Sequence, residues 1–224
     1  FDISKEILKF EDAVTLVNAD HINPLLLGQW HGRSLYLGNQ YPWDTPSNPR
    51  NIPVVGPTVT NSALLLATEM GFGQIVLAGV DLCLSPEGFT HAQGSNEYQA
   101  GPHLGLVGLS VETNDGRRAE TRHDFAHAIH AVSIQAQAAA NAGCRVINPA
   151  PLAARVDYVE HLKPEEIEIG PLEQSARQII AQALPTDSQA DRQDAYADIL
   201  AELAATRTSL EKVANLADKA TEIN

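Results

Sequence analysis

Short, almost continuous apolar runs are the feature that most constrains what this chain can fold into. Three of them, at residues 13–17, 34–37 and 75–80, have the length and composition of buried strands, and a fourth spans residues 144–148. Strands covered on both faces give such runs, whereas strands with one solvated face alternate between apolar and polar residues. The pattern therefore predicts a parallel sheet with helices packed on both sides.

Two helical segments between these strands fit the same fold. Residues 62–70 are apolar or small almost all round and are followed by a glycine, a common helix terminator. Residues 121–142 form a longer helix, in which Thr121 and Asp124 have the spacing of a capping box. We predict an α/β domain with a Rossmann-like, mostly parallel sheet over residues 1–162.

From residue 163 to residue 224 the sequence becomes a helical C-terminal region. Helical patterns cover residues 165–184 and 190–220, with Pro185–Ser188 between them. The second pattern carries apolar residues at largely helical spacing, namely Ile199, Leu203, Leu210, Val213 and Leu216. An amphipathic helix must pack on something. Both an intramolecular partner and another copy of the chain fit, so we expect a homo-oligomer through these helices as one alternative.

Composition excludes several classes of function. The net charge of -13 argues against nucleic acid as a partner, because phosphate binding needs clustered Lys and Arg. No apolar run approaches the roughly 20 residues of a membrane span. The two cysteines, Cys83 and Cys144, lie in apolar settings, which favours buried free thiols in a reducing compartment. We expect a cytoplasmic protein that binds no membrane.

Irregular stretches lie between the predicted elements. Residues 41–53 hold four prolines and are expected to form a loop. Residues 84–108, rich in Gly, Pro, His and Asn, follow the end of a strand, where open α/β sheets bind their ligands. After this long loop, residues 109–113 and 117–121 flank Asn-Asp-Gly at 114–116, which predicts a β-hairpin.

The turn from Gly56 to Ser62 is a candidate anion site. Thr58, Thr60 and Asn61 offer hydroxyl and amide groups at a helix N-terminus, where backbone N–H groups and the helix dipole favour a nucleotide phosphate. Ser, Thr and Asn are also the usual residues that cap helices, so a plain N-cap is the alternative.

Two further candidates follow the predicted strand at residues 75–80. Asp81, two residues after Gly79, is placed at the crevice end of the strand, where it suits a ribose or sugar hydroxyl or a metal ion. A carboxylate that caps the following loop is the alternative. His91 lies in the long loop, where it is either solvated or in contact with a ligand.

Three histidines form one stripe of the predicted helix at residues 121–142. His123, His127 and His130 are spaced at i, i+4 and i+7, roughly opposite an apolar stripe of Phe125, Ile129, Val132 and Ala136. If the apolar stripe faces the core, the histidines face a cleft or solvent. Imidazole suits the deprotonation of a hydroxyl acceptor. Surface or packing roles and a three-histidine metal site are the alternatives.

Arg117, Arg118 and Arg122 form a dense basic cluster in the chain. Such a cluster attracts the carboxylate of an acid sugar or a pyrophosphate. A solvated hairpin edge is the alternative meaning.

The ordered series of these segments resembles a known family. It comprises a Gly/Ser/Thr-rich turn, a small-residue helix, a strand that ends in Gly-x-Asp-Leu, a Gly-Phe-Thr-His-Ala-Gln-Gly segment and a Val-Glu-Thr-Asn-Asp-Gly segment, at residues 56–63, 65–71, 75–82, 88–94 and 111–116, with Thr121 and residues 146–148 beyond them. The family joins bacterial motility accessory factors to the archaeal 6-hydroxymethylpterin pyrophosphokinases, called MptE-like, and the resemblance covers roughly residues 50–170.

The resemblance implies an activity. Motility accessory factors are thought to attach pseudaminic or legionaminic acid, from a CMP-sugar, to flagellin Ser and Thr, and the layout is similar to that of bacterial sialyltransferases. In those relatives the turn before the small-residue helix holds the nucleotide, and a histidine near the later long helix is the general base. Carried over, His123 becomes the base, with His127 in reserve. The donor contacts become Gly56, Thr58, Thr60, Asn61, Gly79 and Asp81, and the other substrate contacts become His91, Gln93 and Arg122.

The resemblance implies neither a tightly bound cofactor nor a metal for this reaction. The alternative enzyme class is pyrophosphate transfer from ATP to a hydroxymethyl pterin, as the archaeal relatives perform, which needs Mg²⁺. Asp81 is one candidate ligand for that ion. A third alternative is a non-catalytic domain that docks flagellin or another protein through the C-terminal helices.

The relatives also carry a Gly-Pro-Ser phosphate-binding turn after their first strand, and this chain shows no such turn. We expect residue 1 to lie past it. The alternative is that this member has lost part of the nucleotide site, and in either case the activity of the 224 residues alone is an open question.

Overall fold

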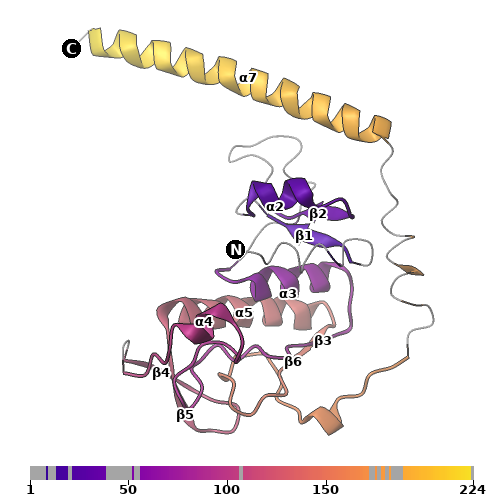
Figure 1. Ribbon diagram of the computed structural model, residues 1–224, viewed down its shortest axis with the longest axis vertical. Helices are drawn as coiled ribbons and strands as arrows, with labels where there is room; N and C mark the ends of the chain where they lie inside the picture. The colour runs from indigo at the N-terminus through magenta and orange to yellow at the C-terminus, as the bar shows by residue number, and fades with distance from the viewer. Residues whose placement is uncertain are drawn as a thin grey trace. The chain divides into compact units, whose positions relative to one another are not determined.

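The structure is a computed structural model of the 224-residue chain. It describes residues 9, 14–19, 22–38, 52, 56–105, 108–171, 175, 178–179, 182 and 189–222. The chain divides into two compact units, Phe1–Ile169 and Gly170–Asn224. Figure 1 labels the elements of both units. The predicted proline-rich loop at residues 41–53 lies outside the described residues, apart from residue 52.

The first unit alternates short strands with helices. In chain order its elements are β1 (Leu16–Asn18), α2 (Pro24–Gln29), β2 (Ser34–Tyr36), α3 (Val59–Glu69), β3 (Gln74–Val76), α4 (Asn96–Gln99), β4 (Leu109–Glu112), β5 (Arg118–Thr121), α5 (His123–Asn141), β6 (Arg145–Ile147) and the 3₁₀ helix η2 (Pro164–Glu166). The second unit contains the long helix α7 (Gln189–Glu222).

The described strands form three two-stranded sheets. β1 pairs with β2 and β3 pairs with β6, both in parallel, while β4 and β5 form an antiparallel hairpin. This mixture of helices with parallel and antiparallel pairs confirms the α/β class. A single Rossmann-like sheet that joins the pairs stays a prediction. The hairpin predicted around Asn-Asp-Gly is confirmed, with Gly116 in the left-handed region at φ 83°.

The strand predicted over residues 75–80 is shorter than expected. β3 ends at Val76, and one more pairing bond follows, from the Leu77 N–H to the Ile147 carbonyl at 2.8 Å. The chain then turns away at Gly79, whose φ of 72° is accessible to glycine and costly for other residues. The apolar run continues past the turn because its later residues enter the core from a loop instead of from a strand.

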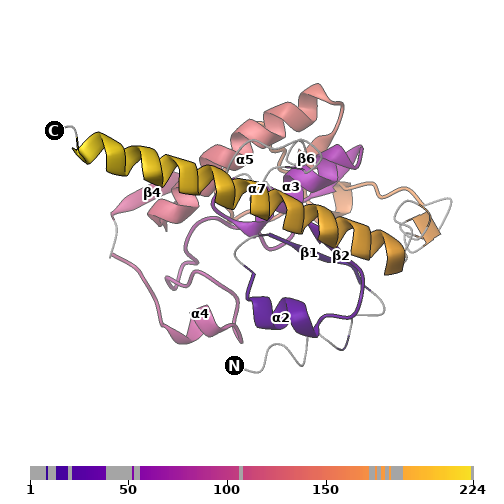
Figure 2. The same cartoon turned by 90° about the horizontal axis from the view of Figure 1, so that it is seen from above.

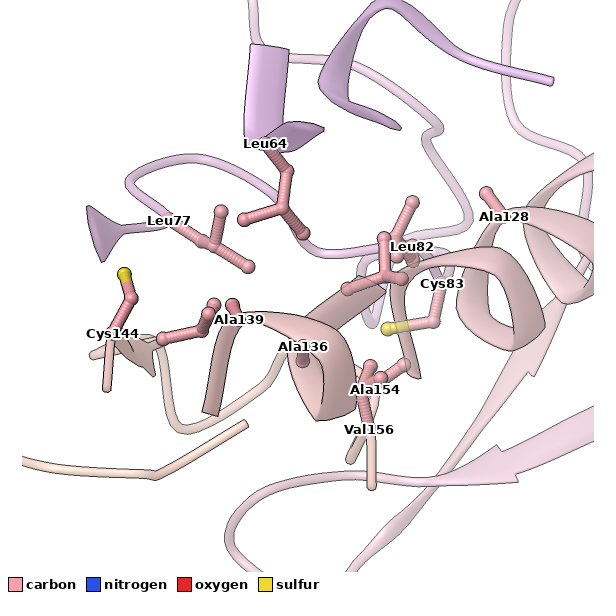
Figure 3. Close-up of a cluster of buried hydrophobic side chains, with 12 residues drawn as sticks. Leu64, Leu77, Leu82, Cys83, Ala128, Ala136, Ala139, Cys144, Ala154 and Val156 are labelled. Atoms are coloured by element: carbon pink, nitrogen blue, oxygen red, sulfur yellow. The ribbon is translucent and has the colours of Figure 1, made fainter. Parts of the chain in front are cut away.

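Helix α5 packs against the core through small residues. Ala128, Val132, Ala136 and Ala139 are fully buried, at i, i+4, i+8 and i+11 along one face. Alanine lets a helix approach its neighbours closely, and Figures 1 and 2 show α3 and α5 side by side. Figure 3 shows the buried cluster in which α5 meets the chain that follows β3.

The two cysteines belong to that cluster. Cys83 and Cys144 are both buried and free, which confirms the prediction of buried thiols. Burial, reinforced by the nearby charge of Asp81, raises the pKa of the Cys83 thiol to about 11. Cys83 also donates a hydrogen bond to the Leu152 carbonyl. Its thiol is therefore a packing group and not a nucleophile.

The start of α5 differs from its predicted cap. The helix begins at His123 with Arg122 as its N-cap, two residues later than predicted. The hydroxyl of Thr121 is buried and donates to the Leu82 carbonyl at 2.8 Å, so it does not cap the helix. The capping-box spacing therefore pointed to a residue, Thr121, whose hydroxyl anchors the loop at Leu82 and does not cap α5.

Of the two helices predicted in the C-terminal region, the second is confirmed and the first is wrong at its start. α7 confirms the helix expected over residues 190–220. The helix expected over residues 165–184 is wrong at its start, because only the 3₁₀ turn η2 forms and residues 167–171 are not helical. Pro171 explains this, since proline lacks an N–H and disfavours helical geometry in the residue before it. Most of residues 172–188 lie outside the described part of the chain.

Candidate functional site

The N-termini of α3 and α5 lie toward the carboxyl ends of β3 and β6. α3 runs into β3 through a short turn, and α5 runs into β6 in the same way, so each helix lies antiparallel to the strand that follows it. A bridge between Ile147 and Glu160 adds a third parallel segment beside β6. The residues that follow these strands and precede these helices therefore meet at one edge of the sheet, the carboxyl edge.

Residues 80–84, which follow β3 at this edge, are anchored by contacts from distant parts of the chain. The bonds are Asn148 Nδ2 to the Val80 carbonyl (2.8 Å), the Ala154 N–H to the Asp81 carbonyl (2.7 Å), Thr121 Oγ1 to the Leu82 carbonyl (2.8 Å), Cys83 Sγ to the Leu152 carbonyl (3.2 Å) and the Leu84 N–H to the Glu120 carbonyl (2.8 Å). Each residue in turn is tied to β6, β5 or the loop after β6. The segment is thus a rigid support for the one side chain that it exposes, Asp81.

Asp81 stands out electrostatically at this edge. The residue is exposed, yet the protein that packs around its carboxyl group raises the pKa of that group by desolvation. Leu82 beside it has φ 52°, a left-handed conformation that is rare for a branched residue. Strain held by surrounding contacts, next to a perturbed carboxyl group, is typical of functional sites. Asp81 lies in the loop that follows β3, five residues past the end of the strand at Val76, and its role in a site stays a prediction.

The turn before α3 caps the helix and is held by hydrogen bonds of Asn61. Thr58 donates to Asn61 Oδ1 from both its N–H (3.2 Å) and its hydroxyl (2.7 Å). Asn61 is fully buried and exchanges two hydrogen bonds with Gln135 of α5, one from each side-chain amide. Asn61 is thereby engaged within the protein, and it fixes the turn.

The other predicted residues of this turn remain accessible. Gly56 is exposed, and Thr58 and Thr60 are half-buried. Gly56 has φ 77°, and a Cβ on it would lie 2.4 Å from the Asn61 side chain, so only glycine fits. The arrangement presents the first amides of α3 at the carboxyl edge, where backbone N–H groups can donate hydrogen bonds to an anion.

The predicted histidine stripe has the predicted orientation. Val132 and Ala136 of the opposite stripe are buried, whereas His123, His127 and His130 are exposed. His123 is the first residue of α5, two positions after Thr121, whose hydroxyl contacts the Leu82 carbonyl. Among the three histidines, His123 is therefore the nearest in sequence to the residue that anchors Leu82.

No cluster of three or more His, Cys, Asp or Glu side chains suited to a metal ion occurs among the residues that the structure describes.

The long loop after β3 reaches the start of α5. The His91 ring lies 6.4 Å from the Phe125 ring, and the Arg122 guanidinium lies 5.8 Å from the same ring. Arg122 also pairs with Asp124 at 3.0 Å. Two predicted substrate contacts, His91 and Arg122, are thus brought together on one aromatic side chain. Gln93, the third, is exposed in the same loop.

The basic cluster separates into two parts. Arg117 pairs with Asp115 at 2.6 Å, which holds the pKa of that carboxyl group well below its usual range, and Arg118 bonds Ser110. Both arginines serve the hairpin, as the alternative of a solvated hairpin edge expects. Arg122 alone belongs to the surroundings of α5 and the long loop.

His161 is a residue that the sequence reasoning missed. Its Nδ1 lies 2.9 Å from the Asn148 carbonyl at the end of β6, beside the bridge at Glu160. A carbonyl oxygen only accepts, so Nδ1 carries the proton and Nε2 of the neutral ring is the basic nitrogen. Residues 159–161 lack any strand pattern, and their pairing with β6 is long-range. The one available signal was a histidine shortly after a predicted strand.

Comparison with known proteins gives one match. The family model described as 6-hydroxymethylpterin diphosphokinase MptE-like matches residues 1–87. The match includes β1 to β3, the turn before α3 and Asp81, and it starts N-terminal of the expected segment at residues 50–170. No curated protein and no solved structure gives a significant match.

Proposed function

We propose that the protein is a transferase that moves a group from a nucleotide donor to a hydroxyl acceptor at the carboxyl edge, because residues 1–87 match the MptE-like family model. The leading candidate reaction transfers pseudaminic or legionaminic acid from its CMP-sugar to a Ser or Thr of flagellin. The observation that carries the proposal is the anchored 80–84 segment, which exposes Asp81 after β3 and is tied through Thr121 to the residues directly before α5.

Donor binding is proposed at α3 and β3. The first amides of α3, presented by the turn from Gly56 to Thr60, suit the CMP phosphate. Asp81 suits a ribose hydroxyl, because a carboxylate accepts hydrogen bonds from sugar hydroxyls. Gly79 allows the chain to turn directly before this contact. Asn61 contributes by holding the turn in place and does not touch the donor.

The chemical step needs a base for the acceptor. The acceptor oxygen attacks the anomeric carbon, the bond from that carbon to the CMP phosphate oxygen breaks, and the hydroxyl proton passes to an imidazole nitrogen. His123 is the first candidate for that imidazole and His127 the second. His161 is a third, because its bound Nδ1 leaves Nε2 basic at the same edge. Arg122, His91 and Gln93 suit the carboxylate and hydroxyls of the acid sugar.

The second candidate function is pyrophosphate transfer from ATP to a hydroxymethyl pterin. The description of the matching family model favours it. That reaction uses Mg²⁺, which takes few protein carboxylates and completes its shell with phosphates and water. Asp81 alone would supply the protein ligand, and this donor set fits the ion's preference. The metal would neutralise phosphate charge, while the turn before α3 would orient the phosphates.

We propose a cytoplasmic location, where activated nucleotide donors are made and where the two buried free thiols stay reduced. Among the described residues, no helix combines the length and the apolar character that a membrane crossing requires. The net charge of -13 disfavours nucleic acid as a partner.

Calorimetric titration separates the two reactions. CMP binding that does not depend on Mg²⁺ supports the acid-sugar transferase, and ATP binding only with Mg²⁺ supports the pyrophosphokinase. Asp81→Asn should weaken either ligand, whereas Asp157→Asn, at an exposed carboxylate outside the edge, should not. If a folded protein binds neither nucleotide, both reactions are wrong and the non-catalytic docking alternative is favoured.

Turnover assays separate the bases. His123→Ala should lower turnover by roughly 10²–10⁴-fold and leave CMP affinity intact, as removal of a general base does. His130→Ala, at the third histidine of the stripe, is the matched control and should keep near-normal turnover. If His123→Ala is also near normal while His161→Ala is not, the base is His161.

A further inference from the structure

Helix α7 exposes an apolar stripe along most of its length. Figure 1 shows it as one continuous helix, and its 34 residues span about 51 Å at 1.5 Å per residue. Six of its large apolar side chains are between 46% and 65% exposed, namely Tyr196, Leu200, Leu203, Leu210, Val213 and Leu216, while Ile199 is half-buried. Isolated apolar residues on a surface are ordinary, but a continuous stripe on a helix is typical of an interface.

The spacing of the stripe is that of a coiled coil. From Tyr196 onwards the apolar or small residues alternate between steps of three and four, at 196, 199, 203, 206, 210, 213, 217 and 220. These are successive a and d positions of heptads, a repeat of 3.5 residues that keeps one seam facing a partner helix. Leu200 at an e position and Leu216 at a g position widen the seam.

Charges beside the seam select the orientation of the partner. Glu202 occupies a g position and Arg207 the e position of the next heptad. In a parallel, in-register pair of identical helices, g of one chain faces this e of the other, so Glu202 meets Arg207 of the second copy twice by symmetry. In an antiparallel pair with full overlap, Arg207 faces its own counterpart and Glu202 faces Leu216. Only the parallel arrangement is complementary.

The identity of the seam residues bears on the number of chains. Leu203 and Leu210 stand at a positions, while the β-branched Ile199 and Val213 stand at d positions. Leucine at a with isoleucine at d shifts coiled coils from two strands to three or four. Wider bundles also bury e and g positions, where Leu200 and Leu216 stand.

We infer that α7 is covered by further copies of this chain, in a parallel, in-register bundle of more than two helices. Each copy supplies the same stripe, and the ion pair between Glu202 and Arg207 of the neighbouring copy sets the orientation. In one chain Arg207 pairs with Glu211 at 2.9 Å on the exposed side of the helix, a surface contact that exchanges readily for the new one. The inference does not depend on the proposed enzymatic function.

Sedimentation equilibrium of the full chain tests the bundle. We expect a mass three or four times the 24.1 kDa of one chain. Leu210→Glu, at the seam, should give the mass of a single chain, and Asn215→Glu, which adds the same charge on the opposite face, should keep the bundle. A monomeric or dimeric wild type overturns the inference, as does a bundle that Leu210→Glu leaves intact. Far-UV circular dichroism of both variants shows whether α7 remains helical. This control is needed because unfolding of α7 would also abolish association.

Charge reversal tests the orientation. Glu202→Arg and Arg207→Glu should each weaken association about ten-fold or more, and the double variant should restore it. Glu211→Gln removes the partner of Arg207 within the helix and should leave association unchanged. Single reversals without effect, or a double variant as weak as the singles, would rule out the parallel arrangement. If the chain associates with flagellin but not with itself, the inferred self-association is wrong and flagellin is the partner of α7.

Discussion

Replacement of Gly56 by alanine tests whether the close packing of Gly56 on Asn61 stabilises the turn before α3. Gly56 adopts φ 77°, and a Cβ there would lie 2.4 Å from Cγ, 2.6 Å from Cβ and 2.8 Å from Oδ1 of Asn61. Such distances force a shift, and the Cβ of Asn61 is not the free end of a flexible side chain. Asn61 is fully buried, so it has no space to move without breaking its hydrogen bonds.

The expected loss follows from the contacts that break. The left-handed backbone costs alanine about 1–2 kcal/mol. Displacement of the Asn61 side chain removes its cap on Thr58 and its bond to the Gln135 side chain, worth about 1 kcal/mol each. The bond from Gln135 to the Asn61 backbone carbonyl is kept. We therefore expect Gly56→Ala to lower the free energy of unfolding by about 3–4 kcal/mol.

Gly71→Ala is the matched control at the other end of α3. Its φ is 79°, nearly that of Gly56, but nothing lies within 4 Å of the Cβ that would be added. Only the backbone cost applies, so a loss of about 1–2 kcal/mol is expected. Urea unfolding followed by far-UV circular dichroism measures both variants. If Gly56→Ala lowers the free energy of unfolding no more than Gly71→Ala does, the close packing of Gly56 on Asn61 does not stabilise the turn.

Three further variants or modifications test the carboxyl edge. Asp81→Asn should raise stability at pH 7, because desolvation raises the folded-state pKa of this carboxyl group and its charged form is therefore a cost; the gain should vanish as pH falls below 3.8, and urea titrations at pH 7 and pH 3 check this. Thr121→Val should cost about 1–3 kcal/mol, since it leaves the buried Leu82 carbonyl without its donor, again measured by urea unfolding. Iodoacetamide at pH 7 should alkylate Cys83 only after unfolding, because burial and a thiol pKa of about 11 suppress the thiolate, and mass spectrometry of native and urea-treated protein reports the difference.

Sequence reasoning predicted what depends on local patterns. The apolar runs identified β3 and β6, the spacing within residues 121–142 gave the buried and exposed faces of α5, and Asn-Asp-Gly identified the hairpin. Each of these signals lies within a few residues of the element that it predicts. The exit of the chain from β3 was not visible, because the run stays apolar past Gly79 while the backbone leaves the sheet.

Features that depend on distant contacts escaped prediction. Thr121 looked like a cap, but its hydroxyl holds Leu82, 39 residues away. Asn61 looked like a ligand contact, but its partner is Gln135, 74 residues away. His161 gained its place only through the pairing of Glu160 with β6. Periodicity and spacing carry no information on such pairs, which is why the hydrogen bonds that hold these segments in place could not be predicted from the sequence.

Hydrogen–deuterium exchange with and without saturating CMP tests the central claim most directly. If the donor binds at the carboxyl edge, protection should rise in three separate segments, residues 56–62, 79–84 and 121–123, because these lie at the N-termini of α3 and α5 and at the end of β3. The hairpin at residues 109–121 should change little before its last residue. Protection confined to other segments, or no change with CMP and with ATP and Mg²⁺, would contradict a nucleotide site at this edge.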